Sequence, residues 1–398
     1  MEMKTVKLGD IAEFANGLNF DKAAYRAGVK IIGVSDFKDY STPVIDNLTE
    51  VAVDAVKESA RLEENDIIFV RSNGNKDLVG RCMIIPHTSE ELYFSGFCIR
   101  CRFKNTIYAN PRYFLYLFKS PSFRRQLSNT SVGANIQNLS QSRLAMASVS
   151  LPTREVQDKI ASILSAYDDM IDNCKQQIAL LEEAAQRLYR EWFVYLHFPG
   201  HETTPIGENG LPKGWTITIL DDVADITMGQ SPASSFYNNE KIGLPFHQGV
   251  SSFGNIYVVN DTYTSKWTKE APANSILFSV RAPVGRINLT LDKVALGRGV
   301  ASINHKDKMQ PYLYHYLKHF FYKDDVMGNG TIFSSINKDQ LKNVNVLNPS
   351  KETMKLFCDV VAPYDTQLAV IDGKLRYLMK ARDLLLPRLI SGQIEINA

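Results

Sequence analysis

The sequence lacks the features that mark membrane and secreted proteins. It contains no apolar run of the roughly 18 residues that a membrane-spanning helix requires. Its first residues, MEMKTVKLGD, have none of the apolar core of a signal peptide. We therefore expect a cytoplasmic protein with no membrane partner.

Cysteine is scarce and unevenly placed. The five cysteines, an odd number, are scattered at Cys82, Cys98, Cys101, Cys174 and Cys358, which argues against a disulfide framework. Cys98 and Cys101 have the CxxC spacing of a zinc ligand pair, but FCIRCRFK alternates like a strand, and residues three apart on a strand point to opposite faces. No second ligand pair accompanies them. We expect no metal and no cofactor in this chain.

Charge of one sign is also lacking, because the formal net charge is only +2. Nucleic-acid binding, if present, must therefore use local patches. Among the seven histidines there is no HExxH motif and no nucleophile–base pair, so a hydrolase is not expected.

Methyl transfer to DNA has one weak signal. NPRY, which begins at Asn110, resembles the NPPY loop that holds a flipped base, but Arg112 replaces the second proline. A helix that starts at Pro111 and is capped by Asn110 explains the same letters. An adenine DNA methyltransferase in its own right and a coiled-coil scaffold that binds only protein are the two alternatives that the residues leave open.

A heptad pattern dominates the middle of the chain. From Leu151 to Phe193, apolar residues recur at spacings of four and three, which is the pattern of a helix that packs along a partner helix. The predicted seam includes Ile160, Leu164, Tyr167, Ile171, Ile178, Leu181 and Leu188. A second seam near the end has the same rhythm, with Arg382 as one polar member, and includes Phe357, Val361, Tyr364, Leu368, Ile371, Leu375, Leu378 and Leu385.

The two heptad segments are copies within a longer repeat. Pro152 and Tyr167 match Pro349 and Tyr364 at a constant separation of 197 residues. Upstream, LGDIAEFANG echoes LDDVADITMG, ENDIIFVR echoes ANSILFSVR, and GANIQNLSQSRL echoes GTIFSSINKDQL. Each copy is therefore a globular unit of short strands followed by a long helix.

This repeat predicts an α+β protein with two mixed α/β domains in tandem. The expected parts are a first recognition domain at 1–150, a central helix at 151–198, a second recognition domain at 199–347 and a C-terminal helix and tail at 348–398. A Gly- and Pro-rich linker at 197–215 leads into the second domain. We expect the two helices to form an antiparallel coiled coil, because the second must run back along the first to share the seam.

Two similar but divergent domains joined by helices suit a molecule that reads two short DNA patterns a fixed distance apart. Such a molecule needs cations for phosphates and polar side chains for base edges. The candidates in the first half are Arg71, Asn73, Asn75, Lys76, Arg81, Arg100, Arg102, Lys104, Asn135, Gln137 and Asn138. Those in the second half are Lys266, Trp267, Arg281, Arg286, Arg298, Ser334 and Ser335.

The whole chain resembles the specificity subunit of a type I restriction–modification system. The likeness lies in the repeats LPTREVQDKIASILSAYDDMIDN and PSKETMKLFCDVVAPYDTQLAV, in LPKGW, in EWF, and in the tail LLPRLISGQIEI. It implies that each domain reads one half of a bipartite, asymmetric double-stranded DNA target. It also implies that the helices set the gap and dock two methyltransferase subunits, which would bind S-adenosylmethionine, with two restriction and motor subunits for cleavage. Ile163, Met170 and Tyr189, apolar residues outside the seam, are candidate docking contacts, and contact with their own domains would explain them equally well.

Overall fold

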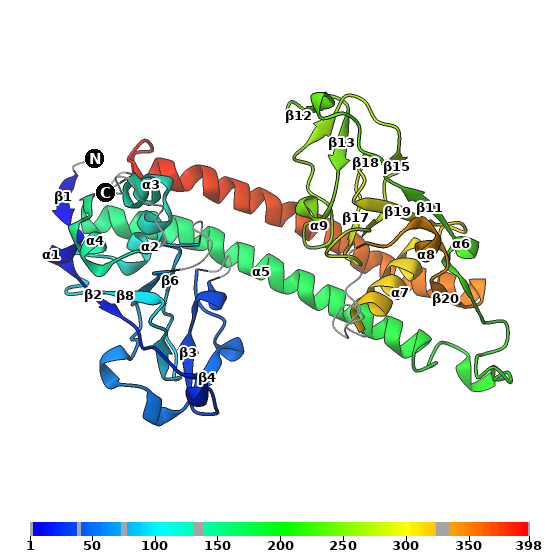
Figure 1. The fold of residues 1–398 in the computed structure, drawn as a ribbon, viewed down its shortest axis with the longest axis horizontal. Coiled ribbons are helices and arrows are strands. Elements are labelled where there is room, and N and C mark those ends of the chain that lie inside the picture. The colour runs from blue at the N-terminus through cyan, green and yellow to red at the C-terminus, as the bar shows by residue number, and fades with distance from the viewer. Residues whose placement is uncertain (1–2, 38–40, 73–77, 130–137, 324–334, 397–398) are drawn as a thin grey trace. The chain divides into compact units, whose positions relative to one another are not determined.

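The computed structural model describes residues 3–37, 41–72, 78–129, 138–323 and 335–396. The chain divides into two compact units, and each is described by itself (Figure 1). Unit 1 comprises Met1–Asp172 and Tyr377–Ala398, and unit 2 comprises Asn173–Arg376. Each unit thus contains one recognition domain and a piece of each long helix.

Unit 1 is built around two small sheets and a two-stranded ribbon. Its strands are β1 (Lys4–Lys7), β2 (Ala12–Asn16), β3 (Val29–Ile32), β4 (Thr49–Val51), β5 (Ile67–Val70), β6 (Cys82–Ile84), β7 (Leu92–Phe94), β8 (Cys98–Phe103) and β9 (Ser148–Leu151). Its helices are α1 (Leu8–Ile11), α2 (Pro111–Lys119), α3 (Pro121–Asn129) and α4 (Gln141–Met146), with the first part of α5 (Arg154–Phe193). The sheet orders are β2-β8-β5-β6, β4-β3-β7 and β1-β9.

Unit 2 repeats this topology with some extra strands. Its strands are β10 (Thr216–Ile219), β11 (Ala224–Met228), β12 (Tyr237–Asn238), β13 (Leu244–His247), β14 (Tyr263–Thr264), β15 (Glu270–Ala271), β16 (Ile276–Ser279), β17 (Ile287–Leu289), β18 (Val294–Leu296), β19 (Val300–His305) and β20 (Asn345–Asn348). Its helices are α6 (Leu220–Val223), α7 (Gln310–Lys323) and α8 (Lys338–Lys342), with the first part of α9 (Lys351–Ile390). The order β11-β19-β16-β17 matches β2-β8-β5-β6, and β10-β20 matches β1-β9. The tandem duplication predicted from the sequence is confirmed.

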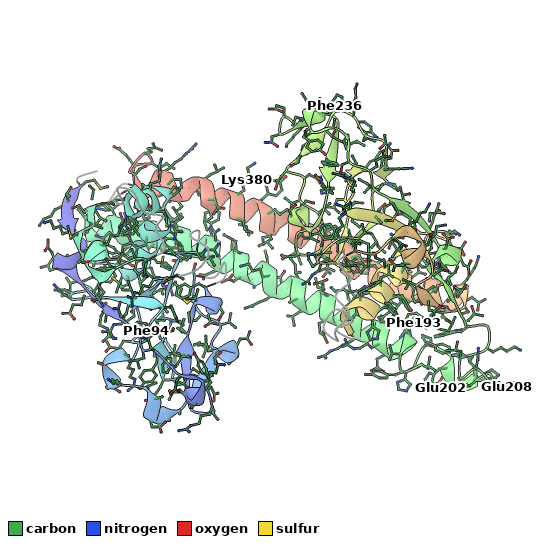
Figure 2. The ribbon with its side chains drawn as sticks, in the orientation of Figure 1. Phe94, Phe193, Glu202, Glu208, Phe236 and Lys380 are labelled. Atoms are coloured by element: carbon green, nitrogen blue, oxygen red, sulfur yellow. The ribbon has the colours of Figure 1, made fainter. Side chains whose placement is uncertain are left out.

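Alternate side chains of β8 contribute to two hydrophobic clusters on opposite faces of its sheet in unit 1. Ile99, Cys101 and Phe103 face the cluster beneath α2, whereas Cys98 belongs to the cluster on the other side of the sheet with Phe94. Figure 2 labels Phe94 within this half of the molecule. Cys98 and Cys101 therefore lie on opposite faces, as the alternation predicts.

In unit 1, the beginning of α5 packs against the end of α9. Ile160 and Leu164 share one hydrophobic core with Leu386 and Leu389 and with the aromatic residues of α2. Further along α5, Asp168 meets Arg382, the polar member of the second seam, with 2.9 Å between carboxylate and guanidinium. The residue numbers rise in one helix as they fall in the other, so the pairing is antiparallel.

In unit 2, the end of α5 packs against the beginning of α9. Tyr189, Trp192 and Phe193 surround Phe357, with ring centroids 5.2–6.2 Å apart. Trp215 of the linker stacks at 5.6 Å on Phe193, which Figure 2 labels near the end of α5. The direction is again antiparallel. Tyr189 is only 2% exposed, so the prediction that it is a docking contact is wrong.

The predicted seams are the inner faces of the two helices. Each predicted seam residue is buried or half-buried. α9 is continuous from Lys351 to Ile390, although Pro363 and Pro387 lie within it. No described helix is both long and apolar enough to cross a membrane.

Candidate nucleic-acid interface

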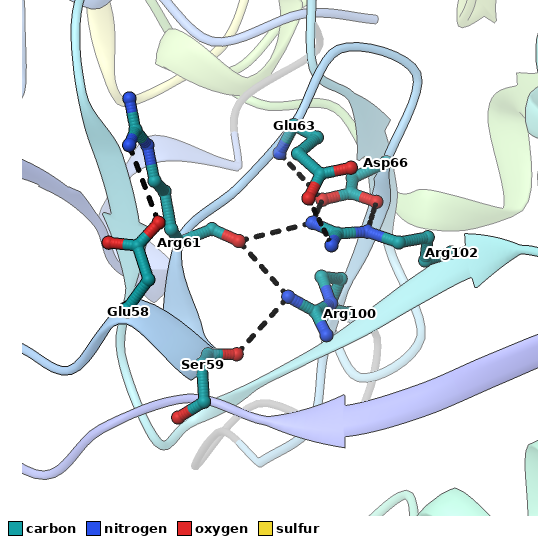
Figure 3. A network of polar contacts seen from close by, with 7 residues as sticks. All are labelled: Glu58, Ser59, Arg61, Glu63, Asp66, Arg100 and Arg102. Carbon is teal, nitrogen blue, oxygen red and sulfur yellow. Dashed lines mark hydrogen bonds and ion pairs between the residues drawn. The ribbon is translucent and has the colours of Figure 1, made fainter.

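The basic face predicted on β8 is occupied by contacts within the protein. Arg102 donates from Nε and Nη2 to both carboxylate oxygens of Asp66, at 2.8 and 2.7 Å, and also binds Glu63. Arg100 donates to the carbonyls of Ser59 and Arg61 at 3.3 and 3.0 Å. Figure 3 shows both guanidinium groups enclosed by this network.

The electrostatics of the network agree with a structural role. Burial, followed by the neighbouring Arg102 charge, lowers the pKa of Arg100. The hydrogen bond to Asp66, which is only 1% exposed, raises the pKa of Arg102. A buried carboxylate requires such a partner. We therefore exclude Arg100 and Arg102 from the DNA interface; Lys104, whose Nζ donates to the Gly9 carbonyl at 2.8 Å, is exposed but also tied to its own unit.

A different surface of unit 1 gathers polar residues from four separate segments. We call it junction 1: residues 17–19 after β2, 71–72 after β5, 95–98 from the end of β7 to the first residue of β8, and 138–139. Backbone hydrogen bonds hold it together: Gly17 N to Cys98 O (3.3 Å), Leu18 N to Phe94 O (3.0 Å), Arg71 N to Phe97 O (2.8 Å) and Leu139 N to Arg71 O (2.8 Å). Ser72 and Asn138 add an antiparallel bridge.

Junction 1 contains a cleft lined by polar, basic and aromatic side chains. A cleft of about 510 Å³ is lined by Asn19, Phe20, Tyr25, Arg71, Ser72, Ser95, Gly96, Phe97 and Asn138. Phe97 is 58% exposed, although it is a large apolar side chain. Arg71 is half-buried, and its Nη1 donates to the Gly96 carbonyl at 3.2 Å. An anchored cation beside an exposed aromatic ring suits contact with a nucleotide.

Unit 2 contains a matching junction, in which the same four backbone hydrogen bonds recur. Junction 2 comprises residues 229–231, 280–281, 297–300 and 335–336. Its hydrogen bonds are Gly229 N to Val300 O (3.0 Å), Gln230 N to Leu296 O (3.0 Å), Val280 N to Gly299 O (2.9 Å) and Ile336 N to Val280 O (2.9 Å). Arg281 and Ser335 form the matching bridge. Two surfaces with the same backbone frame thus stand at equivalent places in the repeat.

The backbone hydrogen bonds also correct the sequence alignment of the repeat, which placed Arg71 opposite Arg281. Arg71 and Val280 make the same two backbone bonds, so Arg281 is equivalent to Ser72, not to Arg71. Arg281, Arg298 and Ser335 are exposed, and the Arg298 N–H donates to Ser231 Oγ at 3.0 Å. Five of the predicted residues, Arg71, Asn138, Arg281, Arg298 and Ser335, therefore lie in the junctions.

The other predicted DNA-binding residues that the structure describes stand outside the two junctions. Lys266 Nζ lies 4.7 Å from the ring centroid of Phe236, which Figure 2 labels at the outer edge of unit 2. Trp267 donates to Glu270 at 2.8 Å. Arg81 is half-buried and Arg286 is exposed. Asn73, Asn75, Lys76, Asn135, Gln137 and Ser334 lie outside the described residues.

The NPRY segment forms a helix start. The Asn110 side chain accepts from the Tyr113 N–H at 3.1 Å, with Pro111 in the first turn, as predicted. Tyr113 is 0% exposed. The ring that a methyltransferase of this type needs for stacking on a flipped base is thus enclosed in the core. Within the described residues, no group of three or more His, Cys, Asp or Glu side chains is placed to hold a metal ion.

Comparison with known proteins gives the class of the fold. A crystal structure of the type I restriction–modification system S subunit from M. genitalium superposes with a TM-score of 0.63 at 13% identity, over 98% of this chain and 96% of that one. The tandem α+β architecture with two long helices is therefore that of a type I S subunit.

Sequence comparison then gives the family. The type I restriction modification DNA specificity domain matches residues 1–183 and 212–378. A Methanocaldococcus jannaschii protein, provisionally named as the MjaX type I restriction enzyme specificity subunit, is 30% identical over 408 residues, covering 98% of this chain and 93% of the relative. The HindI specificity subunit of Haemophilus influenzae is 27% identical over 62% of this chain and 69% of its own length. The chain belongs to the type I restriction–modification specificity subunit family, and its function is DNA target recognition.

Proposed function

We propose that the chain is the non-catalytic subunit that reads a bipartite, asymmetric double-stranded DNA target, with one half read by each junction. The observation that carries this proposal is the recurrence of one backbone frame with two different sets of side chains. Equal frames let both units approach a duplex in the same way, whereas different side chains select different bases. An asymmetric target with two short specific halves follows.

The test is methylation of a randomised duplex library by the chain together with its methyltransferase partner. We expect two short specific blocks separated by a gap of fixed length. Arg298→Ala should alter the base frequencies of one block, and Phe97→Ala those of the other. Selection of a single continuous block, or the same changes from both variants, would refute the division of labour.

We further propose that the long helices dock two methyltransferase subunits, which bind S-adenosylmethionine and methylate adenine. Exposed apolar residues off the seam support this. Ile163 (38% exposed) and Tyr377 (78%) lie in unit 1, and their repeat equivalents Val360 (44%) and Leu180 (71%) lie in unit 2. Each unit therefore offers the same pair of apolar positions, one from each helix, as two copies of one partner require.

Stoichiometry tests this docking. Native mass spectrometry of the assembled complex should give two methyltransferase copies for the wild type. Ile163→Ser with Tyr377→Ser should release one copy, and Leu180→Ser with Val360→Ser should release the other. Val53→Ser, at a 66% exposed residue in the turn at Val53–Ala55 of unit 1, is the matched control. Two copies retained in both double variants would show that docking occurs elsewhere.

Two restriction and motor subunits complete the proposed assembly, which acts on cytoplasmic DNA. In this assembly the helices act as a spacer. Deleting one heptad from both α5 and α9 at equivalent positions should shorten the preferred gap and leave both half-sequences unchanged. A gap that stays constant in the shortened protein would refute the spacer role.

A further inference from the structure

The two junctions carry different side chains at equivalent positions of the same turn. In junction 1, a Cβ added to Gly96 would stand 2.2 Å from Asn19 Oδ1. In junction 2 the equivalent pair is Arg298 and Ser231, and the smaller serine accepts the Arg298 N–H. Asparagine with glycine, or serine with arginine, are thus two alternative ways to fill the same place.

The next position along the turn has the opposite arrangement. Phe97 projects into solvent in junction 1. Its equivalent in junction 2 is Gly299, where an added Cβ would lie 2.2 Å from the backbone carbonyl of Gln248. Because backbone cannot move aside as a side chain can, junction 2 has no room for a side chain here. An exposed ring at this position is therefore possible in junction 1 and excluded from junction 2.

The resulting surfaces have different chemistry. Junction 2 presents two exposed guanidinium groups, Arg281 and Arg298. Junction 1 presents Phe97 with the exposed amides of Asn19 and Asn138, while its one arginine is anchored to Gly96. In the major groove, the guanidinium fork fits the O6 and N7 acceptors of guanine. A side-chain amide fits adenine N6 and N7, and an apolar ring contacts the thymine methyl group.

We infer that unit 2 reads a guanine-containing half-site through Arg281 and Arg298, and that unit 1 reads an A·T-containing half-site through Phe97, Asn19 and Asn138. This inference rests on the proposed function of the junctions in DNA recognition. It assigns the base class of each half of the target and the residues that select it.

Modified bases test each contact at the level of single atoms. The complex with its methyltransferase partner first selects its motif from a randomised library, and the half altered by Arg298→Ala is assigned to unit 2. Replacing guanine in that half by 7-deazaguanine removes only N7, and should reduce methylation on the order of 10-fold or more. Replacing thymine by deoxyuridine in the other half removes only the methyl group, and should reduce it several-fold.

The variants should abolish these sensitivities. Complexes with Arg298→Ala or Arg281→Ala should methylate duplexes containing guanine or 7-deazaguanine at equal rates. Complexes with Phe97→Ala should methylate duplexes containing thymine or deoxyuridine at equal rates. Lys293→Ala, at an exposed residue paired with Glu270, should behave as the wild type. A wild type that selects a bipartite motif but ignores both modified bases would overturn this inference and leave the proposed function intact. A wild type that selects no motif would refute the proposed function itself.

Discussion

Replacing Asp168 and Asp365 by asparagine should change the stability of the protein in opposite directions, although the two residues are equivalent in the repeat. Asp168 accepts hydrogen bonds from Arg382 (2.9 Å), Tyr116 (2.8 Å) and Ser41 (2.9 Å). In the repeat, the position of Arg382 is taken by Ala185, 197 residues earlier. Asp365 therefore has no arginine at that place.

The pKa values reflect this difference. Burial alone would raise the pKa of Asp168, but the hydrogen bonds from Arg382 and Tyr116 and the Lys119 charge lower it below its ordinary value. Burial raises the pKa of Asp365 from 3.8 to about 6. A shift of roughly two units corresponds to a free-energy cost of at most ~3 kcal/mol for the ionised form.

The sign of each effect follows from these directions. Asp365 imposes no penalty below its unfolded pKa of 3.8; the penalty grows as the pH rises from there to about 6 and is constant above it. Asp365→Asn should therefore stabilise unit 2 by about 1–2 kcal/mol at pH 8, less than the full cost because the amide is also buried, and have little effect at pH 4. Asp168→Asn should destabilise unit 1 by ~2–3 kcal/mol at pH 8, because the half-buried Arg382 guanidinium loses its carboxylate partner on α5 and keeps only Asp383. That loss should shrink as the pH falls through the lowered pKa of Asp168.

Urea unfolding separates the two outcomes. All three tryptophans, Trp192, Trp215 and Trp267, lie in unit 2, so their fluorescence follows that unit. Hydrogen exchange of peptides from β5 and β8 follows unit 1. Asp359→Asn, at an exposed residue paired with Lys355, should change stability by less than ~0.5 kcal/mol. If Asp365→Asn destabilised unit 2 at pH 8 as much as Asp168→Asn destabilises unit 1, the reasoning from the missing arginine would be wrong.

Two further pairs of substitutions test the packing. Arg102→Met should lower the free energy of unfolding by ~3 kcal/mol, since it leaves Asp66 ionised and buried, yet the methylation motif should keep its base frequencies; a change of motif would place Arg102 in the DNA interface. Gly299→Ala should destabilise unit 2 by ~2 kcal/mol or more because of the Gln248 carbonyl, whereas Gly373→Ala, with no atom within 4 Å of the added Cβ, should stabilise it by ~0.5–1 kcal/mol. Equal tryptophan-monitored unfolding midpoints for the two glycine variants would contradict this steric account.

Periodic patterns in the sequence predict most of the fold. The helix seam depends only on spacing, so Leu164 and Val361 are recognisable without knowing their partner. Likewise, the alternation in β8 predicts that Cys98 and Cys101 diverge, and the cap at Asn110 follows from the residue that precedes Pro111. Each of these inferences concerns neighbours in sequence.

Inferences about distant neighbours were less successful. Alternation correctly separates Arg100 and Arg102 from the core, but it does not show that Asp66 and the 59–61 carbonyls fold back over that face. Arg281 was aligned one position away from its structural equivalent, because only the hydrogen bonds of the frame define the register. No pattern in the sequence marked Phe97 or Asn19 as a candidate, because the other residues of junction 1 come from separate segments of the chain.

The two turns differ in how far recognition can diverge after duplication. Because the frame is held by backbone atoms, changes of side chain can alter the target without dismantling the fold. A new side chain at position 96 would meet the end of the Asn19 side chain, which can rotate aside, whereas one at position 299 would meet the backbone carbonyl of Gln248. The turn of unit 1 is therefore open to a larger residue at 96, while the turn of unit 2 is closed to one at 299.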